Sequence, residues 1–177
     1  MLPYFTEKFG NPSAIYAKGQ EAQDAIQQAR RDVAGVINAA NPNEVFFTSG
    51  GSEADNWALK GVMDAYKDKK GKHLITTKIE HHAILHTAQF LEQHGFEVTY
   101  LDVDKDGLVS PEAFEAAIRP DTVMASIMFA NNEIGTIEPI KELAEIAHKH
   151  KVIFHTDAVQ AFCHEKIDVQ EMGIDLM

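Results

Sequence analysis

The chain has 177 residues, of which 45% are hydrophobic and 24% charged, and a formal net charge of −11. This length and apolar content favour one globular domain with one substantial core. The acidic excess, without a run of basic residues, argues against a nucleic-acid partner, and no apolar stretch is long enough to suggest a membrane partner. The single cysteine, Cys163, excludes an internal disulfide framework, so we expect a cytoplasmic protein.

Short β-branched runs alternate with longer helical patterns along the chain. This predicts an α/β fold with a mostly parallel sheet and crossover helices. In chain order, we expect helices and strands as follows: helix 19–38, strand 45–48, helix 52–69, strand 74–77, helix 83–94, strand 98–101, helix 111–118, strand 123–129, helix 139–150, strand 152–156 and strand 175–177. Parallel sheets bind ligands at the carboxyl ends of their strands, so the residues after each strand are the candidate site residues.

Both ends of the sequence look cut. The pattern over residues 173–177 predicts the start of an apolar strand that stops with the chain, although a domain seldom ends on backbone groups that lack partners. We therefore expect a fragment that is truncated at both ends.

The first candidate site is the sequence Phe-Phe-Thr-Ser-Gly-Gly-Ser-Glu-Ala-Asp-Asn over residues 46–56. Gly50 and Gly51 allow a sharp turn, and the helix that opens near Ser52 leaves amide groups without partners. A phosphate fits such a helix start. The alternative is an ordinary strand-to-helix turn capped by Ser52.

The second candidate follows the strand 74–77. An imidazole at His81 is placed to stack on a flat cofactor ring. His82 and His86, one helical turn apart, raise the alternative of a metal site, but no third ligand is indicated and Glu80 lies outside a His-Glu-x-x-His frame. We expect no metal there.

Residues 102–107 copy the first half of a calcium-binding loop, with acids at alternate positions and glycine sixth. The twelfth position of that loop falls on Ala113, so the bidentate carboxylate is missing, and residues 97–101 resemble a strand rather than the required helix. We expect an exposed acidic turn.

Two further candidates follow the later strands. Asn131 and Asn132 offer amide donors to a carboxylate or ring oxygen, or simply form a turn. Asp157 either caps the next helix or holds a ring nitrogen protonated, and Gln160 follows at helix-like spacing. A protonated pyridine withdraws electrons from a carbanion, which is what pyridoxal phosphate chemistry needs.

Five motifs in order extend over almost the whole chain: GNPS at 10–13, FTSGGSEADN at 47–56, IEHHA at 79–83, NNEIGT at 131–136 and HTDAVQ at 155–160. Together they resemble cysteine desulfurases of the class V aminotransferase family. The resemblance implies that residues 1–177 form the large-domain portion of a pyridoxal-phosphate-dependent transferase of fold type I.

The resemblance also implies roles for individual residues. Six would bind the cofactor: Gly51 and Ser52 its phosphate, His81 the face of its ring, Asn132 ring and substrate, Asp157 the ring nitrogen and Gln160 the ring hydroxyl. His81 is in addition the candidate catalytic residue for proton transfer, and His155 is expected to line the same cavity.

Some features of the family differ or are missing here. Ser52 stands where the family usually has threonine, Tyr16 replaces a histidine, and Cys163 lies where relatives commonly have glycine. The family's Schiff-base lysine would follow shortly after Met177, in a Ser-x-His-Lys motif, and its sulfur-accepting cysteine much later. We therefore expect this chain alone to be inactive.

By this resemblance the intact enzyme converts L-cysteine to L-alanine and passes the sulfur, as a persulfide, to an acceptor protein. It would be a homodimer that serves iron–sulfur cluster assembly or tRNA thiolation. The alternatives are a selenocysteine lyase or another class V enzyme, a catalytically inactive module with the same fold, and an acidic calcium-binding module.

Overall fold

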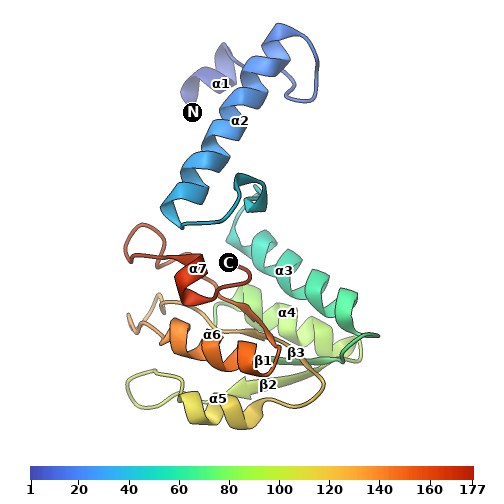
Figure 1. Cartoon of the computed structure of the whole chain (residues 1–177), viewed down its shortest axis with the longest axis vertical. Coiled ribbons are helices and arrows are strands. Elements are labelled where there is room, and N and C mark those ends of the chain that lie inside the picture. Colours follow the sequence, from blue (N-terminus) through green and yellow to red (C-terminus); the bar gives the residue numbers. More distant parts are fainter. The chain divides into compact units, whose positions relative to one another are not determined.

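A computed structural model describes residues 1–177, and in it the chain forms two compact units, residues 1–47 and 48–177 (Figure 1). The single domain predicted from the length of the chain is therefore wrong. The sheet and its core lie wholly within residues 48–177, and residues 1–47 form a separate unit. No helix combines the length and the apolar character that crossing a membrane requires.

The first unit is helical. It contains α1 (Leu2–Thr6), α2 (Ala17–Val36) and a 3-10 turn (Pro42–Glu44), and α2 confirms the helix predicted over 19–38. Its loop over 10–13 depends on Gly10, because a Cβ there would lie only 2.0 Å from the carbonyl oxygen of Lys18. The predicted strand 45–48 is wrong: none of these residues belongs to a strand, and Phe46 and Phe47 are 64% and 52% exposed. An extended segment becomes a strand only where a neighbour meets its backbone groups.

The second unit is built on a parallel sheet. Its strands are β1 (His73–Thr77), β2 (Glu97–Leu101), β3 (Thr122–Ser126) and β4 (Ile153–His155), in the order β2-β1-β3-β4. Every pairing is parallel, with Leu74 opposite Val98 in β2 and Met124 in β3. The predicted parallel sheet with crossover helices is confirmed.

The last three predicted strands are shorter in the structure, whereas β1 and β2 each begin one residue before the predicted start. β3 stops at Ser126 instead of residue 129, yet the next residues stay tied to the neighbouring strand by Ile127 N to His155 O (3.1 Å) and Phe129 N to Asp157 O (2.8 Å). The strand predicted over 175–177 is reduced to one bridge between His155 and Leu176. The bonds beyond β3 hold the two carboxyl ends in a fixed register.

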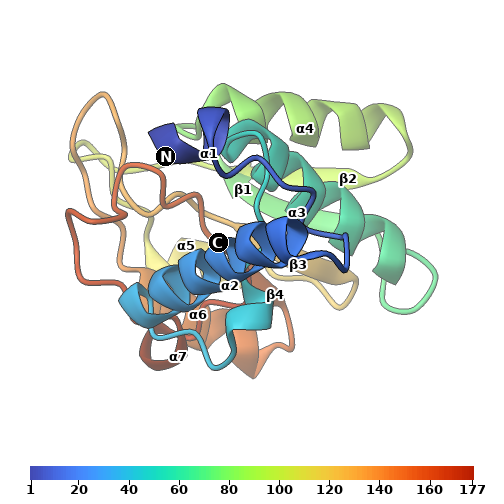
Figure 2. The same cartoon turned by 90° about the horizontal axis from the view of Figure 1, so that it is seen from above.

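Five helices surround the sheet: α3 (Gly51–Tyr66), α4 (His82–Gln93), α5 (Pro111–Ala117), α6 (Ile140–Lys149) and α7 (Val169–Met172). The first four confirm the predicted helices. α3 and α4 cover one face and α5 and α6 the other (Figure 2). Leu59 and Met63 of α3 pack with Ile84 of α4 and Leu74 of β1, which makes this interface a fully buried part of the core.

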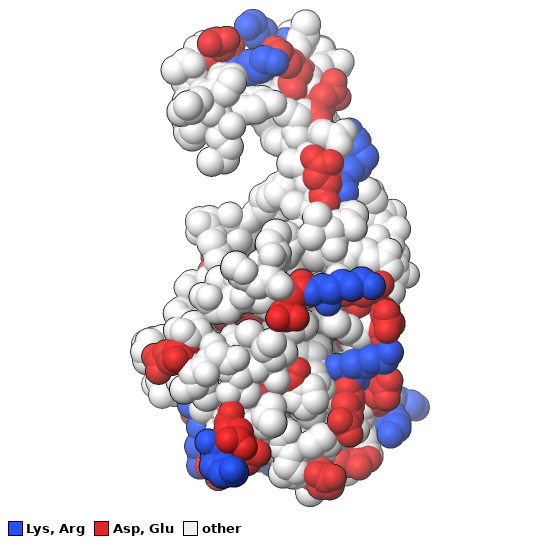
Figure 3. Space-filling model, turned by 90° about the vertical axis from the view of Figure 1, so that its left-hand side faces the viewer, with Lys and Arg blue, Asp and Glu red and all other residues white.

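The predicted acidic turn is confirmed. Asp104 Oδ1 accepts hydrogen bonds from the amides of Asp106 and Leu108, each at 2.9 Å, so its carboxylate closes the turn on its own backbone. Lys and Arg side chains are interspersed with Asp and Glu side chains over the face drawn in Figure 3. That face carries no basic patch of the kind that nucleic acid requires.

Candidate functional site

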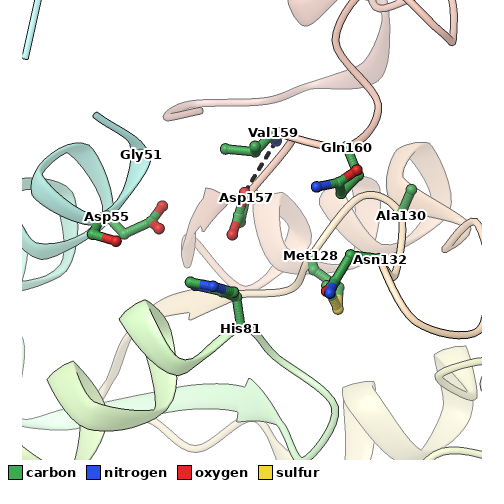
Figure 4. Close-up of a pocket in the computed structure, with 10 residues that line it drawn as sticks. Gly51, Asp55, His81, Met128, Ala130, Asn132, Asp157, Val159 and Gln160 are labelled. Carbon is green, nitrogen blue, oxygen red and sulfur yellow. Dashed lines mark hydrogen bonds between the residues drawn. The ribbon is translucent and has the colours of Figure 1, made fainter. Parts of the chain in front are cut away.

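One pocket brings the predicted site residues together. It is a cavity of about 230 Å³ at the carboxyl ends of β1, β3 and β4, beside the start of α3 (Figure 4). Its lining consists of Gly51, Ser52, Asp55, His81, Met128, Ala130, Asn132, Asp157, Val159 and Gln160. All six residues proposed as cofactor contacts are among them, because parallel strands end at the same edge of a sheet.

The start of α3 leaves backbone donors open toward the pocket. Gly50 is the N-cap residue and Ser52 lies inside the helix without a capping bond, so the alternative of a turn capped by Ser52 is wrong. The amides of Gly51 and Ser52, at the first two helical positions, have no acceptor within the helix. A Cβ on Gly51 would lie 2.9 Å from Cγ2 of Val159, so only glycine leaves this space open. The result is a concave group of donors suited to an anion.

His81 connects β1 to the start of α4. It is the N-cap residue of that helix, and its Nδ1 accepts the amide of Ala83 at 3.1 Å. In a neutral ring the proton must therefore sit on Nε2. The sequence motif alone did not reveal this capping bond, and it makes Nε2 a proton donor toward any ligand in the pocket.

Asp157 lies just beyond β4 and is only 8% exposed. Its Oδ1 accepts the amide of Val159 at 3.0 Å, which forms a turn rather than the helix cap that was the alternative (Figure 4). Its second carboxylate oxygen has no hydrogen-bond partner in the chain. Gln160, three residues on, is exposed and lines the same pocket. The pocket thus contains a positioned carboxylate oxygen that is available to a ligand.

Of the two asparagines after β3, one forms a turn and the other faces the pocket, and these are the two roles predicted for them. Asn131 forms the turn, since its Oδ1 accepts the amides of Glu133 (2.8 Å) and Ile134 (3.0 Å). Its Nδ2 donates to the carbonyl of Ile79 at 3.0 Å, which links this loop to the one that carries His81. Asn132 is exposed and faces the pocket.

His155 does not line the pocket as expected. It is 1% exposed, and its Nδ1 lies 2.9 Å from Oγ of Ser126, so it belongs to the buried layer beneath the pocket. The sequence analysis also missed Asp55, which lines the pocket and is 5% exposed. Its position four residues after Gly51, one helical turn along the same face, is the signal that would have identified it.

Glu80 is a second carboxyl that sequence reasoning missed. It is 5% exposed, and its Oε1 accepts the amide of Met128 (2.8 Å) and the hydroxyl of Thr77 (2.9 Å). Its Oε2 has no partner. Burial raises the pKa of Glu80 to about 8, so the side chain is mainly protonated at neutral pH and joins the loops after β1 and β3 as a neutral acid.

This burial predicts a pH-dependent stability difference between the wild type and Glu80→Gln. The folded pKa of about 8 lies above the ordinary value of 4.5, so the folded state binds the proton more tightly. The contribution of Glu80 is therefore complete below about pH 4.5 and is lost as the pH rises toward 8. A tenfold change in proton affinity corresponds to about 1.4 kcal/mol. In urea unfolding, the free energy of unfolding of Glu80→Gln relative to the wild type should rise between pH 5 and pH 8 by at least about that amount.

The matched control for Glu80→Gln is Glu145→Gln, at an exposed position on α6. Its stability relative to the wild type should stay constant between the two pH values. A constant difference for Glu80→Gln as well would contradict the buried, protonated acid.

His82 and His86, the alternative metal pair, stack with ring centroids 5.3 Å apart. No group of three His, Cys, Asp or Glu side chains in residues 1–177 is arranged to hold a metal ion. Cys163 is exposed and lies in the left-handed backbone region with φ of 65°, a conformation that favours glycine.

The family model for aminotransferase class V matches residues 1–177. The chain belongs to the class V aminotransferase family. Among class V relatives, cysteine desulfurase IscS of Clostridium botulinum (strain Kyoto / Type A2) is 61% identical over the whole chain, which covers 44% of that protein. Cysteine desulfurase IscS of Methanosarcina thermophila is 59% identical, with 43% of its length covered. The chain thus spans less than half of these class V relatives.

Two solved structures are similar to this chain. SspA in complex with cysteine superposes with a TM-score of 0.93 at 44% identity, covering 98% of this chain and 49% of that one. A NifS-like protein gives a TM-score of 0.94 at 38% identity, covering 98% and 48%. The predicted α/β fold class is confirmed.

Class V aminotransferases use pyridoxal phosphate, and the pocket fits that group. Two features of this chain fit the cofactor: the open amides at the start of α3, in a space that a Cβ at Gly51 would fill, and the second carboxylate oxygen of Asp157, which lines the pocket and takes no hydrogen bond from the chain. The first suits a phosphate and the second a protonated ring nitrogen.

Proposed function

We propose that this chain is the cofactor-binding portion of a pyridoxal-phosphate-dependent cysteine desulfurase. The observation that carries the proposal is the convergence of the start of α3, His81, Asn132 and Asp157 on one pocket. Relatives about 60% identical are named cysteine desulfurases, and one similar structure is a complex with cysteine. These similarities support L-cysteine as the substrate of a protein that contains this chain.

The phosphate would lie at the start of α3. The amides of Gly51 and Ser52 would donate hydrogen bonds to it, the hydroxyl of Ser52 would add a third donor, and the positive end of the helix dipole would favour its negative charge. These groups would fix one end of the cofactor.

The ring would lie between His81, Asp157, Asn132 and Gln160. The free oxygen of Asp157 would accept a hydrogen bond from the protonated ring nitrogen, and His81 would stack on the ring face. Gln160 would donate to the ring hydroxyl, and Asn132 would help to position the ring and the substrate. When bound, pyridoxal phosphate supplies an electron-withdrawing ring that stabilises negative charge on the substrate. Asp157 keeps that ring protonated.

His81 would handle protons at Nε2. Because Nδ1 is engaged by the amide of Ala83, a neutral His81 approaches the ligand as a donor. It would give a proton at Nε2 before taking one back at the same atom. The capping bond also fixes the plane of the imidazole, so that proton is presented in one direction.

The wider biology is proposed from the same resemblance. A sulfur-acceptor protein would take the persulfide, and the intact enzyme would act in the cytoplasm as a homodimer that supplies iron–sulfur cluster assembly or tRNA thiolation. The names of the IscS relatives support the iron–sulfur role. Ile134, an apolar side chain that is 59% exposed, lies on a surface that a second subunit would cover.

Substitution of Gly51 by alanine tests the phosphate site. The added methyl group enters the space 2.9 Å from Val159 and crowds the open amides, so we expect the affinity for pyridoxal phosphate to fall at least about tenfold, or about 1.4 kcal/mol. Fluorescence titration measures the change. Gly61→Ala, farther along α3, is the matched control, because a Cβ there meets only Cδ1 of Trp57 at 3.8 Å. Equal affinities of the two variants would overturn the phosphate site.

The reaction itself is tested by measuring alanine formed from L-cysteine. No lysine of residues 1–177 lines the pocket, so these residues alone should bind the cofactor without covalent capture by borohydride and form no alanine. A protein that contains this chain together with the remaining segments of its relatives should form it. Turnover of L-selenocysteine but not of L-cysteine would favour a lyase instead.

A further inference from the structure

Asp55 is a buried carboxyl that the proposed cofactor contacts leave unexplained. It lies on α3, is 5% exposed, and points into the pocket on the side that faces Asp157 (Figure 4). It accepts no hydrogen bond from the chain, and its polar contact is Nε2 of His155, 3.8 Å from its Oδ1. A buried carboxylate without a donor is costly, so its protonated form is favoured.

The contact with His155 is not an ion pair at neutral pH. Burial lowers the pKa of His155 to about 4, so its imidazole is neutral, with Nδ1 beside the hydroxyl of Ser126 at 2.9 Å. Burial, and after it the charge of Asp157, raises the pKa of Asp55 to about 7. Asp55 therefore changes its charge close to neutral pH, whereas His155 does not.

The surroundings of Asp55 offer it little positive charge. Asp157 and His155 face it from the end of β4, and Glu80 and His81 from the turn between β1 and α4. β3 contributes the hydroxyl of Ser126 and no titratable side chain. On α3 itself, Glu53 is exposed and accepts the amide of Ser49 at 2.6 Å. Loss of the proton from Asp55 thus adds a second negative charge next to Asp157.

That charge would appear one helical turn from the open amides. Gly51 and Asp55 are four residues apart on α3 and line the same pocket, so an anion held at Gly51 and Ser52 lies close to the carboxyl of Asp55. In a partly enclosed site the repulsion between these charges is weakly screened. A ligand without the anionic group avoids most of this repulsion.

We propose that Asp55 is a positioning residue that controls ligand entry by its proton: with the proton the pocket admits a phosphate-bearing ligand, and without it the ligand is repelled. The proposal rests on the proposed function of the pocket. It adds to that function a carboxyl that sets the pH range in which the cofactor binds.

The test compares pyridoxine 5′-phosphate with pyridoxine, two ring alcohols that cannot react with surface lysines. Their dissociation constants are measured by calorimetry between pH 6 and 9 for the wild type, Asp55→Asn and the control Asp64→Asn. Asp64 lies on the same helix but is exposed and pairs with Lys67 at 2.6 Å. The asparagine at 55 imitates the protonated carboxyl at every pH.

For the phosphate ester, the ratio of the wild-type dissociation constant to that of Asp55→Asn should rise from pH 7 to pH 8 by up to about tenfold. The ratio for pyridoxine should stay nearly constant, and Asp64→Asn should behave as the wild type. Carbon-13 NMR of the Asp55 carboxyl in the wild type, without ligand, should show titration near pH 7.

The outcomes separate the two proposals. Failure of the wild type to bind the phosphate ester at any pH overturns both. Binding with the same pH dependence in the wild type and in Asp55→Asn overturns only the role of Asp55, as does an Asp55 carboxyl that titrates near pH 4.

Discussion

Asp157→Asn should weaken the binding of pyridoxal phosphate by about 10- to 100-fold. The asparagine keeps an oxygen for the amide of Val159, so the turn is preserved, but the negative charge that meets the ring nitrogen is lost. A hydrogen bond to a charged group contributes about 1.5–3 kcal/mol, and each 1.4 kcal/mol is about tenfold in affinity. Fluorescence titration gives the affinity, and nitrogen-15 NMR of labelled cofactor should show that the ring nitrogen has lost its proton.

Asp102→Asn is the control for this substitution. Asp102 also follows the end of a strand, β2, but it is exposed, pairs with Lys78 at 2.5 Å and lies outside this pocket. Its loss should leave the affinity unchanged. Retention of wild-type affinity and of the ring proton in Asp157→Asn would falsify the role of Asp157.

Phe154→Ala should lower the free energy of unfolding by about 3–5 kcal/mol, the usual cost of removing a fully buried phenyl ring. Phe154 is 0% exposed in the middle of β4. Its backbone accepts hydrogen bonds from Asp175 and Leu176, so a cavity at this position also loosens the segment that continues into Asp157. Urea denaturation followed by circular dichroism measures the loss, and cofactor affinity should fall with it.

Phe5→Ala is the comparison, because Phe5 is 74% exposed on α1. Exposed substitutions of this kind change stability by no more than about 0.5 kcal/mol. Equal stability losses for the two phenylalanines would show that β4 does not belong to the cooperative core.

The sequence predicts most of this fold because the local signals are strong. The apolar run 74–77 has the pattern of a buried strand, and the residues after His81 have the pattern of a helix. The structure contains this strand and this helix at nearly the predicted positions. Residues 45–48 carry an equally apolar pattern, yet no strand in residues 1–177 pairs with them. Strand formation depends on a partner that the pattern itself does not encode.

The candidate site shows the same division. Gly51, His81 and Asp157 follow from strand-end positions and meet in one pocket, whereas Asp55 and Glu80 were missed. Their importance comes from burial, which raises the pKa of each, and burial of a charged residue type is a property of the tertiary structure rather than of spacing. His155 was wrongly expected to line the pocket, because its closeness in sequence to Asp157 does not reveal that it is still part of β4 and buried, whereas Asp157 lies beyond the end of that strand.

The loops after β1 and β3 are joined twice, by Glu80 to the amide of Met128 and by Asn131 to the carbonyl of Ile79. The two loops therefore move as one unit, and the positions of His81 and Asn132 are coupled. A double-mutant cycle across these links should give non-additive energies. An insertion in either loop would displace both side chains together. We therefore expect insertions after β1 or after β3 to be poorly tolerated.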